Sequence, residues 1–81
     1  MTSNSPHKFT LLKLDTPEHL LALSRAETNA PKRLRLLAIS HFLEGRNRTE
    51  ISHILKVSRL SVNTWVAKYL SQGLAGVVLY Q

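Results

Sequence analysis

The stretch of sequence that decides the fold is residues 47–73, NRTEISHILKVSRLSVNTWVAKYLSQG. It carries the start and stop signals of two helices. Asn47 is a favourable N-cap, and Glu50 follows three positions later, as in a capping box. Ser58 is a second capping residue, and Gly73 is a typical residue at a helix end. We therefore predict a short helix that begins after Asn47 and a longer one between Ser58 and Gly73.

Apolar residues recur at helical spacing in both segments. The first segment, ending near Leu55 or Lys56, carries Ile51, Ile54 and Leu55, and the second carries a stripe formed by Val62, Trp65, Val66, Tyr69 and Leu70. Two capped helices joined by a turn of about three residues have the spacing of a helix-turn-helix. In that motif the first helix braces against the DNA backbone and the second enters the major groove. The hydrophobic joint is expected to comprise Ile51, Leu55, Val57, Val62 and Val66.

Two further helices are expected upstream. Thr16 and Pro17 open one over residues 17–27, and Pro31 opens another over residues 31–44 that stops at Gly45. The apolar surface of the second is broad, as expected of the central helix of a bundle. The fold class is all-α, with about four helices and a short C-terminal extension. The expected organisation is a flexible N-terminal arm (1–15), a DNA-binding domain (16–76), and a short apolar tail or the start of a missing segment (77–81).

Composition narrows the class of protein. The chain has 81 residues, which suffices for one domain, and no cysteine, which argues against a disulfide framework or a zinc finger. Apolar runs are too short to span a membrane or to form a signal peptide, so no membrane partner and a cytoplasmic location are expected. Eleven Lys and Arg face five Asp and Glu, and residues 51–81 hold three bases and no acid. This excess suits a polyanion and a nucleoid-associated protein, although a merely basic soluble protein remains the alternative.

The outer face of the second motif helix is small and polar and lacks acids, as a groove-facing surface requires. Asn63 is suited to bidentate pairing with adenine, and Arg59 to guanine or phosphate. Leu60 is a contact for a thymine methyl or simply a surface leucine. Trp65 and Tyr69 have the spacing of core residues rather than of base-stacking aromatics. The candidate base-reading residues are Arg59, Leu60, Ser61, Asn63 and Thr64.

Basic residues elsewhere are candidates for phosphate contacts. Arg46 and Arg48 flank the start of the bracing helix, where phosphates commonly lie. Three bases open the helix at 31–44, where the helix dipole disfavours cations; backbone contact, pairing with Glu27 or Asp15, and simple exposure all explain them. The candidate phosphate-binding residues are Arg46, Arg48, Lys68, Lys32, Arg33 and Arg35.

Catalysis is not expected of this chain. The four histidines show no metal-ligand spacing and no cysteine accompanies them. The acids are scattered, and neither a nucleophile motif nor a glycine-rich phosphate loop is present. We therefore expect no catalytic site, no metal and no cofactor.

Three stretches carry a resemblance to a known family: RLRLLAISHFLEG (33–45), TEISHILKVSRLSVNTWV (49–66) and YLSQGLAG (69–76). Over about residues 16–76 the chain resembles the N-terminal DNA-binding region of bacterial insertion-sequence transposases of the mariner-like superfamily, which share a homeodomain-like, paired-type helix-turn-helix. The resemblance implies terminal inverted repeats as the DNA target. It also implies transposition and DNA recombination as the setting, with a metal-dependent catalytic domain elsewhere in a full-length relative.

The sequence departs from this family in three respects. Lys56 occupies a turn position that is usually glycine, where a left-handed backbone would cost a non-glycine residue about 1 kcal/mol. Ser52 stands where alanine is common. The catalytic domain is missing, so a fragment, a truncated element and a stand-alone binder all stay open.

Three hypotheses of function follow. The first is a sequence-specific binder of double-stranded DNA of transposase origin. The second is a small transcriptional regulator, which a homodimer and a palindromic site would favour. The third is a helical protein-interaction module that uses the first two helices and the apolar tail at 77–80.

Overall fold

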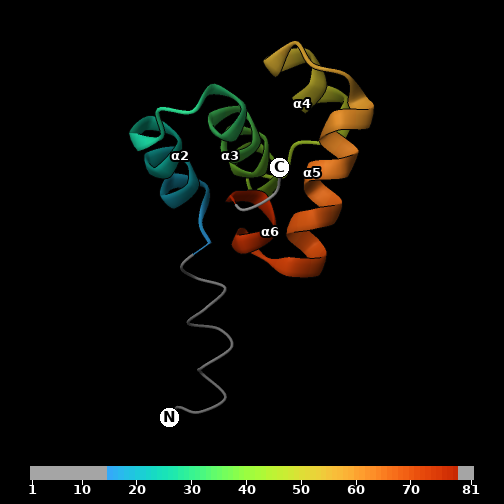
Figure 1. Ribbon diagram of the computed structural model, residues 1–81. Coiled ribbons are helices and arrows are strands. Elements are labelled where there is room, and N and C mark those ends of the chain that lie inside the picture. The colour runs from blue at the N-terminus through green and yellow to red at the C-terminus, as the bar shows by residue number, and fades with distance from the viewer. Residues whose placement is uncertain (1–14, 79–81) are drawn as a thin grey trace.

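The computed structural model describes residues 15–78, and this part of the chain is all-α with no strand (Figure 1). The predicted fold class is confirmed. The arm predicted at 1–15 and the end of the predicted tail lie almost wholly outside the described residues. The helices are α2 (Pro17–Ala26), α3 (Ala30–Leu43), α4 (Arg48–Leu55), α5 (Arg59–Gln72) and α6 (Leu74–Val78).

The first two helices each begin at a capping residue. The hydroxyl of Thr16 accepts a hydrogen bond of 3.0 Å from the main-chain N–H of His19, and Pro17 opens α2. Asn29 caps α3 in the same way by accepting from the N–H of Lys32. Each boundary lies within one residue of its expected place.

The helix α3 is the central element of the bundle, as predicted. It packs against α2, α4, α5 and α6, and Figure 1 shows it between α2 and α5. Its side chains Leu36, Ala38 and Ile39 are buried in the core. The hydroxyl of Ser40, also buried, donates to the main-chain oxygen of Pro17 at 2.8 Å and so ties α3 to the start of α2.

The helix-turn-helix geometry of α4 and α5 is set by local signals. Both bonds of the capping box are present: Asn47 accepts from the N–H of Glu50, and Glu50 accepts from the N–H of Asn47. Ser58 caps α5 by accepting from the N–H of Ser61. The joint forms as expected, with Leu55 and Val57 partly buried against the fully buried side chains of Ile51, Val62 and Val66.

The turn between these helices contains a residue with a left-handed backbone. Lys56 has φ 57° and ψ 46°, the only non-glycine residue with positive φ among those described. The N–H of Lys56 and that of Val57 both turn back to the main-chain oxygen of Ser52. The buried hydroxyl of Ser52 donates to Thr49, so the polar replacement of alanine is accommodated by a hydrogen bond within α4.

The tail expected from residue 77 onward requires correction. Gly73, with φ 69°, ends α5, and the chain then turns into the short helix α6. Val77 is buried in the core and Val78 packs against it, so both belong to the folded domain. A β-carbon on Gly76 would lie 2.7 Å from the main-chain oxygen of Lys68, which shows how closely α6 approaches α5.

The predicted apolar stripe of α5 is also one residue too long. Val62 and Val66 are fully buried, and Trp65 and Tyr69 pack against the core, which confirms their assignment as core residues. Leu70, by contrast, is 63% exposed. The short α4 lies near the beginning of α5, so it does not cover this end of the longer helix (Figure 1).

Candidate nucleic-acid interface

The face of α5 that was predicted to meet DNA lies on the outside of the molecule. Leu60 is 74% exposed, and Arg59 is exposed beside it. Ser61, Asn63 and Thr64 are half-buried. The buried stripe of α5 occupies the opposite side, so the surface required for entry into a groove is available.

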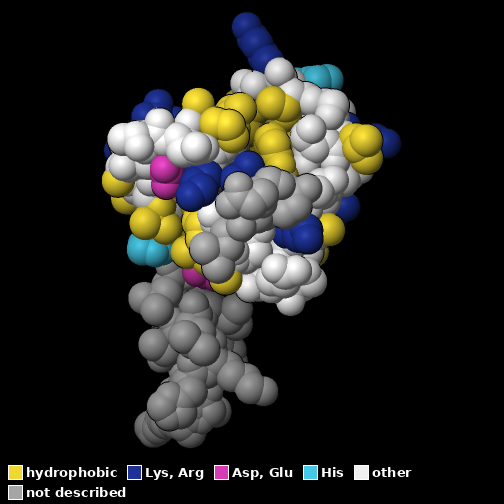
Figure 2. All heavy atoms as spheres, in the orientation of Figure 1, with side chains coloured by type: hydrophobic (Ala, Val, Ile, Leu, Met, Phe, Trp, Pro, Cys, Tyr) yellow, Lys and Arg dark blue, Asp and Glu magenta, His cyan; other side chains and the backbone are white. Residues whose placement is uncertain are grey.

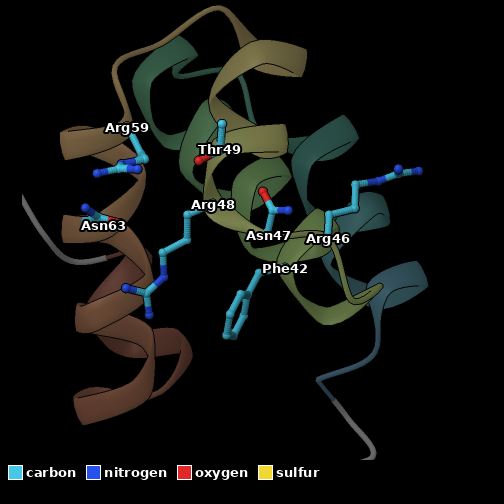
Figure 3. Close-up of a pocket in the computed structure, with 7 residues that line it drawn as sticks. All are labelled: Phe42, Arg46, Asn47, Arg48, Thr49, Arg59 and Asn63. Carbon is cyan, nitrogen blue, oxygen red and sulfur yellow. The ribbon is translucent and has the colours of Figure 1, made fainter.

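A cleft of about 530 Å³ separates the start of α4 from the start of α5 (Figure 3). Two of the candidate base-reading residues, Arg59 and Asn63, line it from α5. The first turn of α4, the loop before it and the end of α3 supply the other lining residues: Phe42, Arg46, Asn47, Arg48 and Thr49. The cleft therefore brings together arginines that lie far apart in sequence.

The arginines of the cleft differ in direction. In Figure 3 the side chain of Arg48 runs from the start of α4 toward α5, whereas the side chain of Arg46 points away from α5. The Nε of Arg46 lies 3.4 Å from a carboxylate oxygen of Glu44, so this base is partly neutralised. Arg48 and Arg59 thus supply most of the positive charge that faces the cleft.

A family model described as a helix-turn-helix domain matches residues 34–78, more than half of the chain. The chain belongs to the helix-turn-helix family. No curated protein and no solved structure was found to match it. The matched region of this helix-turn-helix domain begins in α3 and extends through α6, while α2 precedes it. Membership supports DNA binding as the general function of the domain.

One candidate phosphate contact of the helix-turn-helix domain must be corrected. Arg35 is only 8% exposed, and its Nε donates a hydrogen bond of 3.0 Å to the main-chain oxygen of Val77. A guanidinium buried in this way is not on the surface that a DNA phosphate meets. Arg35 is therefore a residue that anchors α6 to α3.

The two neighbouring bases lie away from the cleft. Arg33 donates two hydrogen bonds, of 3.0 and 3.3 Å, to the main-chain oxygen of Glu27, where it ties α2 to α3. Lys32 is half-buried in the first turn of α3. Ten residues of helix separate Lys32 from Phe42 at the cleft, a distance of about 15 Å at 1.5 Å per residue. Lys32 and Arg33 therefore do not belong to the group of arginines that line the cleft between α4 and α5.

Three lining residues of the cleft are not among the site residues that the sequence predicts: Phe42, Asn47 and Thr49. The sequence predicts Asn47 only as a helix cap. Their one signal is their position close to Arg46 and Arg48 in the chain. The end of α3 forms the wall of the cleft only because α3 crosses behind α4, which local patterns do not reveal.

The lower half of α5 is tied to the beginning of the described chain. The hydroxyl of Tyr69 donates a hydrogen bond of 2.9 Å to a carboxylate oxygen of Asp15. Burial, together with the hydrogen bond and the negative charge of Asp15, raises the pKa of Tyr69 to about 12. This contact holds the segment before α2 against α5, on the side away from the outer face.

The described residues show neither a metal cluster nor a membrane helix. Within residues 15–78 no group of three or more His, Cys, Asp or Glu side chains is placed to hold a metal ion. None of the helices between Pro17 and Val78 has the length and apolar character needed to cross a bilayer.

Proposed function

We propose that this domain binds double-stranded DNA in a sequence-specific manner, with α5 in the major groove. The observation that carries the proposal is the outward face of α5, which has no acidic residue and lies beside a cleft lined by Arg48 and Arg59. A helix that enters the groove must expose short side chains and must not repel phosphate. Residues 51–81 contain bases and no acid, which fits this requirement.

The cleft is the proposed seat of the DNA backbone. Arg48 and Arg59 reach it from two different helices, and guanidinium groups bind phosphate oxygens through charge-assisted hydrogen bonds. A volume of about 530 Å³ admits a phosphodiester group and its waters. Phosphate contacts of this kind fix the register of a protein on the duplex but carry no sequence information. Asn63 shares the cleft, so we assign it to the backbone rather than to a base edge.

The Lys and Arg side chains outside the cleft add to the electrostatic attraction of DNA. Dark blue basic side chains are spread over the face shown in Figure 2, where magenta acidic side chains cover only small areas. Such an imbalance raises the local concentration of a polyanion and makes its affinity dependent on salt. Lys68, on α5, is the remaining phosphate candidate close to the outer face.

The resemblance to mariner-like transposases supports a more specific role. In that setting the domain would recognise the terminal inverted repeats of an insertion sequence, and the chemistry of transposition would belong to a separate catalytic domain. The left-handed turn at Lys56, in the position where the family has glycine, is the structural feature that accords with this origin.

Selection from random duplexes at two salt concentrations tests the proposal. We expect a single enriched motif, bound at least a thousandfold more tightly than random DNA, with an affinity that falls steeply as salt rises. An asymmetric motif of one half-site fits recognition of an inverted repeat by one domain. A palindrome bound by a stable dimer would favour a regulator instead, and an absence of salt-dependent binding would contradict DNA binding altogether.

A variant of Asn63 refines the assignment of the cleft. Asn63→Ala should lower the affinity for the selected duplex and for random duplexes by the same factor, because a contact with the DNA backbone does not depend on sequence. If this variant instead loses its sequence preference at a single base pair, Asn63 contacts a base edge, as its residue type alone predicts.

A further inference from the structure

We propose that α5 recognises thymine through its 5-methyl group, with Leu60 as the central contact. The inference deepens the proposed function and rests on it. It concerns the one strip of α5 that faces directly outward, which the structure separates from the arginine cleft.

The strip is defined by Leu60, Thr64, Ala67 and Ser71, which follow one another at i, i+4, i+7 and i+11. At 3.6 residues per turn these positions share one face of the helix. The fully buried Val62 and Val66 lie on the opposite face. Leu60, Ala67 and Ser71 are exposed, so the strip is the part of α5 that first meets a partner approaching from outside.

The hydroxyl groups of the strip are turned back onto the helix. The hydroxyl of Thr64 donates a hydrogen bond of 3.1 Å to the main-chain oxygen of Leu60, and that of Ser71 donates one of 3.3 Å to Lys68. The hydroxyl protons of Thr64 and Ser71 are therefore not offered to base edges. Leu60, Ala67 and the methyl group of Thr64 leave the strip largely apolar.

An apolar strip has one matching group at the base edges of the major groove. Guanine, cytosine and adenine present hydrogen-bond donors and acceptors there, and thymine alone adds a methyl group. The residues best suited to reading donors and acceptors, Arg59 and Asn63, line the cleft at the flank of α5 instead. The chemistry of the strip therefore favours thymine over the other bases.

Single exposed leucines are common on protein surfaces, and one alone does not indicate a binding site. Leu60 differs because it shares its face with Thr64 and Ala67 and lies next to Arg59. Charge complementarity points to the occupant: the helix that bears the strip contains Arg59 and Lys68 and no acid. A partner that is both anionic and apolar at its recognised edge is a thymine-containing duplex.

The experiment replaces thymine by deoxyuridine, one position at a time, in the duplex that random selection yields. This exchange removes only the methyl group and leaves base pairing and charge unchanged. We expect wild-type protein to lose affinity about fourfold at one or two thymines, the equivalent of one buried methyl-sized group. Leu60→Ala should bind the thymine and uracil duplexes equally well.

Leu70→Ala is the matched control. Leu70 is another exposed leucine of α5, but it lies off the strip and close to the end of the helix. This variant should keep the full preference for thymine over uracil. Because Leu60 and Leu70 are both exposed, neither substitution is expected to change thermal unfolding by much.

The outcomes separate the inference from the proposed function. Absence of any sequence-specific DNA binding would sink the proposed function, and the inference with it. Specific binding to a site without thymine, or uracil tolerated at every position, would overturn the inference alone. A methyl preference that survives in Leu60→Ala would overturn the assignment to Leu60.

Discussion

The guanidinium of Arg35, on α3, lies within the core and donates a hydrogen bond of 3.0 Å to the main-chain oxygen of Val77, on α6. The two residues are 42 positions apart in the chain. Their contact fastens the last turn of the domain to its central helix. The contact accounts for one of the three bases in the first two turns of α3.

Arg35→Ala is expected to destabilise the fold strongly. The substitution leaves the oxygen of Val77 without its donor and removes the packed methylene groups of the side chain, at a cost of about 2–3 kcal/mol in the free energy of unfolding. Urea unfolding measures this change. Arg25→Ala, at an exposed base on α2, should lose less than about 1 kcal/mol. Equal small losses in both variants would contradict the anchoring role.

Lys56→Gly is expected to stabilise the domain. The left-handed backbone at Lys56 strains a residue with a β-carbon, and glycine relieves this strain but gains freedom in the unfolded chain. The net gain should be about 0.5–1 kcal/mol, measured by thermal or urea unfolding. Lys56→Ala removes the charge and keeps the β-carbon, so it should give no gain. A glycine variant no more stable than the alanine variant would refute the explanation.

Arg48→Ala is expected to weaken binding to selected and random duplexes alike. If Arg48 holds one phosphate in the cleft, the slope of log affinity against log salt should flatten by about 1. Affinity measured between 50 and 200 mM salt gives this slope. Arg25→Ala, an exposed base on α2 far along the chain from the cleft, should leave the slope unchanged. The same flattening in both variants would show that the effect reflects net charge only.

The stability of the domain should fall with rising pH above 10. Because the pKa of Tyr69 is raised to about 12 in the folded chain, the folded state keeps this proton while the unfolded state loses it near pH 10. The contribution of Tyr69 to the free energy of unfolding is therefore fully present below pH 10 and is lost as pH rises toward 12. Because the side chain is partly exposed, we expect this contribution to be only roughly 1–2 kcal/mol. Urea unfolding of wild type and Tyr69→Phe from pH 9 to 11.5 isolates this contribution. Parallel pH profiles would contradict it.

Local chemistry made most of the fold predictable. Asn47 with Glu50, Ser58 and Gly73 marked the bounds of α4 and α5, because caps act within a few residues of the chain. The backbone at Lys56 is left-handed although the residue is not glycine, which the departure from the usual glycine had left open. The local structure that these residues favour is present in the folded domain because tertiary packing does not oppose it.

Long-range contacts could not be predicted from the sequence. Charged residues are rarely buried unless they are paired. One partner of the buried Arg35 is a main-chain oxygen of α6, a helix of five residues that is too short to show periodicity. The division between the cleft and the outer strip of α5 likewise depends on how α3 and α4 cross. Residue type alone therefore placed Arg59 and Asn63 with Leu60 and Thr64, whereas the structure separates the pairs.

Titration of isotopically labelled protein with its selected duplex, followed through backbone amide NMR shifts, tests the central claim most directly. That claim is that the outward face of α5 enters the groove while the start of α4 contacts the backbone. We predict the largest shifts in residues 47–49 and 59–71, with residues 17–27 nearly unchanged. Shifts concentrated on α2 and the start of α3, with α5 silent, would contradict the account.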